Sequence, residues 1–253
     1  MPDAAPPLVF TYRFRFQDGQ APEFVLELDP DTLALRTPER AFNPWWTRLG
    51  YFQCDNCPLQ EARHPHCPIA FNLVDVVGFF KNRVSHDEVY VYVEALGRCY
   101  FKHVSLQEAL SSLLGIFIAS SGCPVLDQLR PLVATHLPFM SSDESTYQLV
   151  SMYLMSQFFT ARDGGVPDWR LAGLTEFLES ARQATAGLCA RIKTLHVKDA
   201  LLNALAILNA RGEVTSLTIV DADLGRWRRH FQHQTPGVSG DRPALALAKR
   251  VDD

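Results

Sequence analysis

The stretch LVFTYRFRF, residues 8–16, gives the clearest indication of the fold. Its aromatic side chains occupy alternate positions, and the positions between them are polar: Phe10, Tyr12, Phe14 and Phe16 alternate with Thr11, Arg13 and Arg15. A two-residue period of this kind predicts a β-strand with one buried face. Asp18-Gly19 then favours a turn, and residues 24–28 resume the alternation. We therefore expect a β-hairpin in the first thirty residues.

A second alternating segment occurs later in the chain, at residues 89–93. Gly97 can turn the chain, and residues 99–104 can pair back onto this segment as a fourth strand. The two hairpins together predict one antiparallel sheet.

From Ser105 onward the apolar residues recur at helical spacing. Capping boxes at residues 105–108 and 141–144 predict two helix starts. The second of these helices is apolar on nearly every side over residues 147–159, which indicates a buried central helix. Pro167 is placed to begin another helix at its first turn, and residues 166–211 are expected to form a helical pair that covers the central helix.

The predicted fold class is α+β, in which an antiparallel sheet of two hairpins packs on a C-terminal helical bundle. We assign residues 1–104 to the sheet, with a cysteine-rich metal loop between its hairpins. Residues 105–220 are assigned to a helical half that packs on the sheet as one unit. Residues 221–253 are expected to form a basic and aromatic segment followed by a mobile tail.

Composition argues against several classes of protein. The chain has 253 residues, of which 47% are hydrophobic, so it can bury a sizeable core. Its net charge of -4 provides no general attraction for nucleic acid or an anionic membrane. The basic cluster at residues 226–231 is interleaved with aromatic residues, but we favour a surface helix over a nucleic-acid contact. Neither a signal-peptide core nor a run of membrane-spanning length occurs, so we expect a soluble cytoplasmic protein.

Side chains that can bind metals are concentrated in CDNCP, residues 54–58, and HPHCP, residues 64–68. Cys54 and Cys57 have the C-x-x-C spacing that lets two sulfur atoms face one ion across a tight turn. Cys67 lies in the second motif. In the cytoplasm such thiols are better explained as ligands than as disulfide partners. The three thiols therefore predict a metal site.

Three thiols leave a tetrahedral zinc ion one ligand short. We favour Cys123 as the fourth ligand, because it lies in SSGCP, residues 120–124, where a predicted helix ends. Cys99, His64 and His66 are the alternatives for this position. Zinc is the favoured metal. An iron–sulfur cluster is the alternative, because Cys-Pro steps also occur in iron–sulfur ligand runs.

The sequence lacks a P-loop, a dinucleotide-binding fingerprint, a nucleophile elbow and an H-E-x-x-H motif. This favours a metal-stapled binding or adaptor protein that has a protein partner and no catalytic activity. A metal-dependent or redox enzyme or sensor that uses the same thiols is the alternative. An exchangeable ligand beside His64, His66 or Asp55 would favour the enzyme, and four protein ligands would favour the structural site.

Several segments also carry a family resemblance. They are CxxCPL from Cys54, HCPIAFNL from His66, and residues 106–124, 130–139 and 151–154. Together they resemble an uncharacterised bacterial family known only as a domain of unknown function. The resemblance implies that one motif set contains four of the cysteines, Cys54, Cys57, Cys67 and Cys123, and leaves out Cys99 and Cys189. It implies no activity, and the metal itself is inferred from ligand chemistry.

Overall fold

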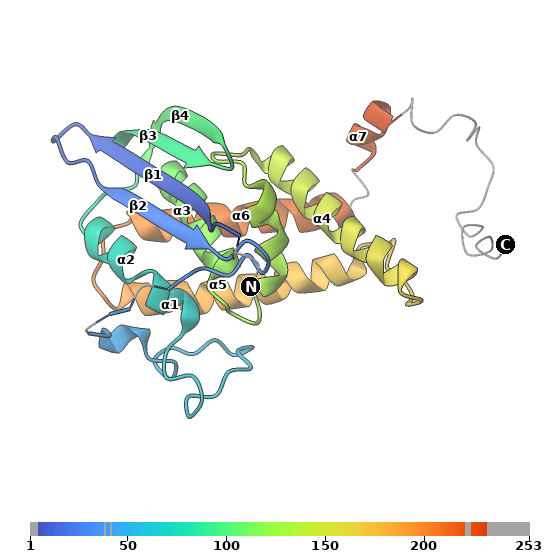
Figure 1. Cartoon of the computed structure of the whole chain (residues 1–253), viewed down its shortest axis with the longest axis horizontal. Coiled ribbons are helices and arrows are strands. Elements are labelled where there is room, and N and C mark those ends of the chain that lie inside the picture. The colour runs from blue at the N-terminus through green and yellow to red at the C-terminus, as the bar shows by residue number, and fades with distance from the viewer. Residues whose placement is uncertain (1–4, 38, 41, 221–223, 232–253) are drawn as a thin grey trace. The chain divides into compact units, whose positions relative to one another are not determined.

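The computed structural model describes residues 5–37, 39–40, 42–220 and 224–231. A four-stranded antiparallel sheet is formed by the N-terminal part of the chain, and the C-terminal part is mostly helical (Figure 1). The predicted α+β class is therefore confirmed. Residues 1–216 form one compact unit and residues 217–253 form a second.

The sheet contains both predicted hairpins. Its strands are β1 (Leu8–Phe16), β2 (Glu23–Leu28), β3 (Glu88–Ala95) and β4 (Arg98–Ser105), in the spatial order β2-β1-β3-β4. Tyr12 of β1 lies opposite Phe24 of β2 on one side and opposite Val93 of β3 on the other. The first strand thus joins the two hairpins, and the segment between β2 and β3 carries the cysteine motifs.

The inner face of the sheet forms part of the core, because the alternating aromatic residues of β1 all point to it. These residues are at most 5% exposed. The helices α2 (Val74–Phe80) and α3 (Leu106–Ser120) pack against this face, and the rings of Phe14 and Phe80 lie 5.2 Å apart. The outer face carries the polar half of the pattern, including the exposed Arg13, as is usual for an antiparallel sheet with one solvated side.

The remaining elements are helical. They are η1 (Trp45–Thr47), α1 (Pro68–Asn72), η2 (Asp127–Thr135), α4 (Ser142–Arg162), α5 (Ala172–Lys193), α6 (Ala200–Val220), α7 (Gly225–Arg228) and η3 (Arg229–Phe231). The helix α6 begins in the first unit and ends in the second, which also contains α7 and η3. The predicted mobile tail lies outside the described residues from residue 232 onward. None of the helices in the described ranges is long and apolar enough to cross a membrane.

The predicted burial of the helix at residues 147–159 is wrong. In α4 the buried residues all lie in the first two turns. Met155, Phe158 and Phe159, further along, are each at least 50% exposed. A helix that is apolar on every side becomes buried only if other elements surround it, and the sequence pattern does not show whether they do. The second half of α4 extends away from the sheet (Figure 1).

The two predicted capping boxes have different outcomes. Ser141 forms a complete capping box, in which its hydroxyl accepts from the amide of Glu144 and its own amide donates to the Glu144 carboxylate. Ser105 directly precedes α3, but its side chain makes no capping hydrogen bond within the described chain. Ser105 is also the last residue of β4, so its backbone conformation is set by the sheet.

The start of α5 is also displaced from its predicted position. Pro167 was expected at the first turn of a helix, but α5 begins at Ala172, after Leu171 adopts a left-handed backbone with φ of 63°. Asp168 supplies the cap, because its carboxylate accepts a hydrogen bond of 2.9 Å from the amide of Gly173. The helix dipole also stabilises a carboxylate near the N-terminus of the helix.

Candidate functional site

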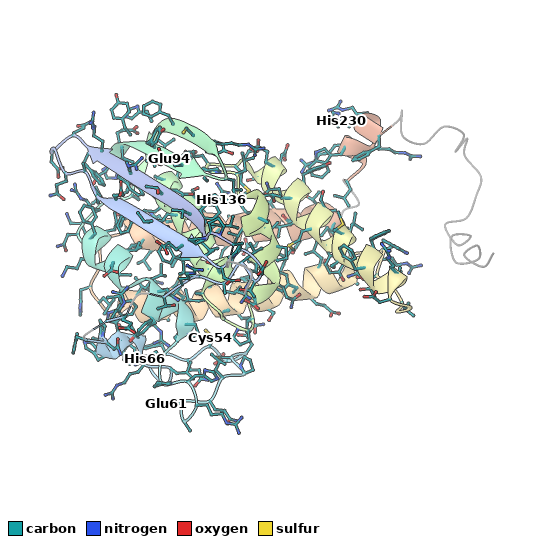
Figure 2. The ribbon with its side chains drawn as sticks, in the orientation of Figure 1. Cys54, Glu61, His66, Glu94, His136 and His230 are labelled. Atoms are coloured by element: carbon teal, nitrogen blue, oxygen red, sulfur yellow. The ribbon has the colours of Figure 1, made fainter. Side chains whose placement is uncertain are left out.

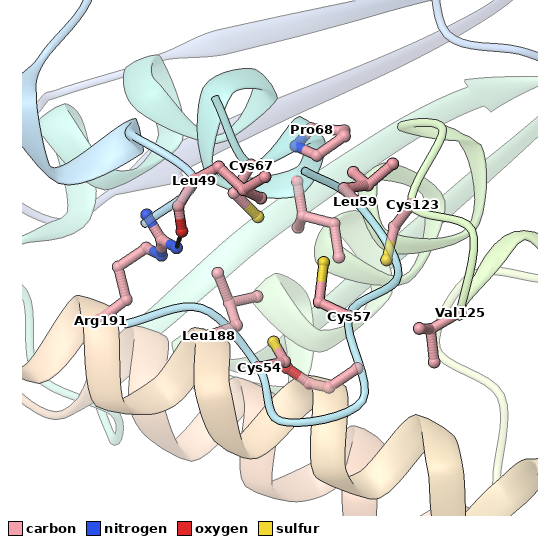
Figure 3. Close-up of a pocket in the computed structure, with 12 residues that line it drawn as sticks. Leu49, Cys54, Cys57, Leu59, Cys67, Pro68, Cys123, Val125, Leu188 and Arg191 are labelled. Atoms are coloured by element: carbon pink, nitrogen blue, oxygen red, sulfur yellow. Dashed lines mark hydrogen bonds between the residues drawn. The ribbon is translucent and has the colours of Figure 1, made fainter. Parts of the chain in front are cut away.

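The predicted cysteine cluster lies around one pocket in the first unit. Cys54, Cys57, Cys67 and Cys123 all line this pocket, and their sulfur atoms are directed toward its interior (Figure 3). Apart from Arg191, the other lining residues are apolar: Leu49, Leu59, Pro68, Ile69, Val125, Ala184 and Leu188. The cavity volume is about 20 Å³, which is the scale of a single water molecule or ion.

Three of the four thiols belong to an irregular segment, residues 48–67, which we call the cysteine loop. Cys54 and Cys57 are joined by a tight turn, in which the amide of Cys57 donates to the carbonyl of Cys54 over 3.0 Å. The amide of Cys67 donates to the carbonyl of Thr47 over 2.8 Å, so the two ends of the loop lie side by side. Cys67 is the residue just before α1, so the start of this helix fixes the position of Cys67.

Cys123 reaches the pocket from a different part of the chain. It lies beyond the end of α3 and comes directly after Gly122, whose φ of 82° turns the chain out of the helix. Cys123 is 8% exposed, and burial raises the pKa of its thiol. The neighbouring backbone amides of Leu126 and Val125 lower the pKa of the thiol and partly oppose that shift. Such amide donors are suited to stabilising a thiolate.

The cysteine loop is attached to α5 by specific contacts. The Cys54 thiol donates to the carbonyl of Ala184 over 3.4 Å, and the Asn56 amide donates to the carbonyl of Ser180 over 2.8 Å. Gly187 allows this close approach, because a Cβ atom there would lie 2.5 Å from the Cys54 sulfur. The predicted C-x-x-C turn therefore rests directly on the helix surface.

The buried side chain of Arg191, on α5, binds the backbone of the cysteine loop and of the residues just before it. Its side chain is nearly fully buried, and its residue exposure is only 2%. The guanidinium donates to four backbone carbonyls, those of Trp46, Arg48, Leu49 and Phe52, over 2.6, 2.6, 3.3 and 3.4 Å. Burial lowers the pKa of Arg191, and the neighbouring thiols of Cys67 and Cys54 oppose the shift. A buried cation thus stands beside the sulfur-lined pocket.

The four thiols line the same pocket, but they are not arranged as metal ligands. Within the ranges that the structure describes, no three Cys, His, Asp or Glu side chains form a group that could hold a metal ion. Burial, followed by the proximity of Cys67 and Cys123, raises the pKa of Cys54 to about 11. A neutral thiol is therefore the favoured form of Cys54 at neutral pH. Metal ligation requires thiolates, so it would have to displace this proton.

The alternative ligands lie elsewhere. His66 shares a hydrogen bond of 2.8 Å between its Nδ1 and the Thr47 hydroxyl, and neither His66 nor His64 lines the pocket. Cys99 is exposed on β4, and Cys189 is partly buried on α5. Arg191 was not singled out from the sequence. The signal that could have identified it is its position beside Leu188 and Ile192, within the apolar stripe of a predicted helix.

A second buried polar cluster lies under the sheet, at a distance from the cysteine loop (Figure 2). The Tyr12 hydroxyl lies 2.6 Å from His136 Nε2 and 2.8 Å from the Ser112 hydroxyl. Burial lowers the pKa of His136 to about 4, and burial also raises the pKa of Tyr12. Both groups are therefore neutral at pH 7. The cluster ties β1 to α3 and to the segment just after η2.

The fold and the pocket define an α+β protein in which sulfur atoms from both halves of the chain surround one small cavity. Residues 10–232 match the model of a family described as Domain of unknown function (DUF6901), and the chain belongs to this family. The expected resemblance to a domain of unknown function is thereby confirmed. Neither the curated proteins nor the solved structures compared with the chain include a match.

Proposed function

We propose that Cys54, Cys57, Cys67 and Cys123 bind one zinc ion, which joins the cysteine loop to the helical half of a cytoplasmic, non-catalytic protein-binding module. The observation that carries this proposal is that four thiols, three from the cysteine loop and one from the segment after α3, line one small pocket. Four thiolates are a common ligand set for tetrahedral structural zinc.

The size of the pocket supports a single ion. A cavity volume of about 20 Å³ matches one ion, whereas an iron–sulfur cluster also contains inorganic sulfide and needs more room. The spacing of Cys54 and Cys57 and the tight turn between them suit two ligands on one ion. Cys67 and Cys123, which also line the pocket, would complete the tetrahedron after the side chains adjust.

Electrostatics also support this ligand set. Four thiolates around one divalent ion leave an excess of negative charge, which is costly in an apolar setting. The buried guanidinium of Arg191 provides an opposite charge from within the protein. Its hydrogen bonds to carbonyls of the cysteine loop would at the same time hold the ligand-bearing backbone in place.

A structural role follows from the number of protein ligands. Four thiols fill the coordination sphere of zinc, whereas a catalytic ion keeps one position open for water or substrate. The rival role is a redox enzyme or sensor that uses the same thiols. Redox work needs a thiolate in the metal-free protein, where burial raises the pKa of Cys54 to about 11. A bound zinc ion, in contrast, itself displaces the proton of each thiol that it binds.

The test is metal analysis of the whole 253-residue chain purified without oxygen, combined with its visible absorption spectrum. We expect one zinc ion per chain and no visible absorption. The Cys123→Ser variant should lose most of its zinc and melt at a lower temperature, because a structural ion contributes its binding energy to folding. Stoichiometric iron with a coloured spectrum would show a cluster instead and would contradict zinc.

Two control variants address the other cysteines. Cys99→Ser makes the same chemical change at an exposed thiol, and Cys189→Ala removes the partly buried thiol of α5. Both should keep their zinc. Full zinc occupancy in Cys123→Ser would remove this residue from the ligand set, and zinc-free wild-type protein would refute the proposal.

A further inference from the structure

The exposed side of α4 carries several large apolar side chains. It consists of Glu144, Gln148, Ser151, Met155, Phe158, Phe159 and Arg162. Each of these side chains lies three or four residues from another member of the set, so they share a face of the helix. We call this set the α4 face. Met155, Phe158 and Phe159 are 58%, 50% and 52% exposed.

This face is too apolar for a helix that only borders water. Residues 145–161 contain no charged side chain. A helix on the surface of a monomer usually has charged residues opposite its buried side. Clustered exposed aromatic and methionine side chains instead mark surfaces that contact another protein. We propose that the α4 face pairs with the α4 face of a second copy of this chain, in antiparallel orientation about a two-fold axis.

Self-pairing is favoured by the order of residues along the face. In an antiparallel pair, residues at equal distances from the centre lie opposite each other, because both helices rise equally per residue. With the centre at Tyr153, the small Ser151 lies opposite the large Met155. Gln148 lies opposite Phe158 in the same register. Met155 and Phe158 therefore meet side chains that differ from their own in size or shape, and neither collides with its own copy, as suits a two-fold interface.

The charges at the two ends agree with the same register. Glu144 lies opposite Arg162 when the centre is at Tyr153, and the two-fold axis creates this pair twice. Glu144 is ionised at neutral pH, because the hydrogen bonds from Ser141 lower the pKa of its carboxyl group. A parallel pair would instead place Glu144 beside Glu144. The charge pattern thus distinguishes the antiparallel second copy from a parallel one.

The length of the contact is adequate for a specific interface. α4 has 21 residues, so it is about 30 Å long. The register uses the helix from Glu144 to Arg162, which is nearly its whole length. An apolar centre with charges confined to the ends is the usual composition of a stable interface.

The test is sedimentation velocity of the full chain over a range of micromolar concentrations. We expect a concentration-dependent dimer for the wild type. Phe158→Glu should weaken it by more than about 100-fold, because each dimer contains the substitution twice. Circular dichroism and thermal melting should show that this variant keeps its fold, because Phe158 is half exposed in the single chain.

The matched control is Phe101→Glu, the same substitution at a phenylalanine that is 67% exposed on β4. It should leave the dimer unchanged. A monomeric wild type at all concentrations would overturn the proposal. A dimer that survives Phe158→Glu, or that Phe101→Glu disrupts equally, would place the interface elsewhere and would also overturn it.

Discussion

The cysteine loop and α4 are attached to the first unit in opposite ways. The loop has little regular structure, but the buried side chain of Arg191 binds its backbone and Cys54 rests on α5. α4 is a regular helix of 21 residues with a complete cap, yet its second half is largely exposed. The difference shows that regular geometry depends on neighbouring residues, whereas firm attachment depends on contacts with distant ones.

The largest expected effect is the loss of the side chain that holds the cysteine loop. Arg191→Met should lower the free energy of unfolding by more than about 3 kcal/mol, because buried carbonyls lose their hydrogen-bond donors. Urea denaturation measures the change. The control is Arg182→Met on the same helix, where an exposed guanidinium pairs with Glu179. Equal losses in the two variants would show that Arg191 does not anchor the loop.

The next effect concerns the segment that leads into α4. The folded protein holds His136 neutral with a pKa of about 4, below its usual value of 6.5. The unfolded chain therefore binds this proton more readily between pH 6.5 and pH 4. The contribution is fully present above pH 6.5 and is lost as the pH falls toward 4, by about 3 kcal/mol in total.

Unfolding free energies across this pH range measure the effect. The comparison is with His136→Gln, which cannot titrate but keeps a polar side chain. Subtracting the two curves removes the contribution of every other titrating group. We expect the variant to lose less stability on acidification. An identical slope would show that His136 can be protonated without disturbing its buried site.

A smaller effect should result when the loop is pushed away from its helix. Gly187→Ala places a methyl carbon 2.5 Å from the Cys54 sulfur, which is closer than the two atoms can pack, so the loop must shift. We expect a loss of about 1–3 kcal/mol, the usual cost of overpacking, together with weaker zinc retention. Gly212→Ala in α6 is the control, because its new methyl group would meet only Leu178 at 3.7 Å. A stable Gly187→Ala variant with full zinc would show that the contact is adaptable.

The smallest effect tests the local determinants of α4. Ser141→Ala removes the capping hydrogen bond to the Glu144 amide and should cost about 1 kcal/mol. Ser105→Ala is the matched control, since the Ser105 side chain forms no capping bond within the described residues. Thermal denaturation of the two variants measures the difference. A larger loss for Ser105→Ala would reverse the assignment of the two caps.

The sequence was sufficient to predict features that depend on nearby residues. The two-residue alternation of residues 8–16 identified the central strand, and Ser141 with Glu144 identified the start of α4. It was insufficient where a distant part of the chain decides the outcome. The exposure of Phe158 depends on which elements lie beside α4, and the buried position of Arg191 depends on backbone that precedes it by more than a hundred residues.

In the candidate site, too, the sequence predicted the features that depend on nearby residues and missed those that depend on distant ones. The C-x-x-C spacing drew attention to Cys54 and Cys57, and the grouping of all four cysteines around one pocket agrees with the predicted set. Whether they bind a metal stays a prediction. The role of Gly187 could not be anticipated, because it depends on where the Cys54 sulfur approaches α5. No spacing rule within the loop contains that information.

The separation between Cys54 and its contact on α5 also has a consequence during synthesis of the chain. The two partners are 130 residues apart, so the ribosome takes on the order of 10 s to make the helix after it has made the thiol. Throughout that interval the surface of α5 on which the Cys54 thiol comes to rest has not yet been made. The cysteine loop can therefore reach its final position only after α5 has been synthesised.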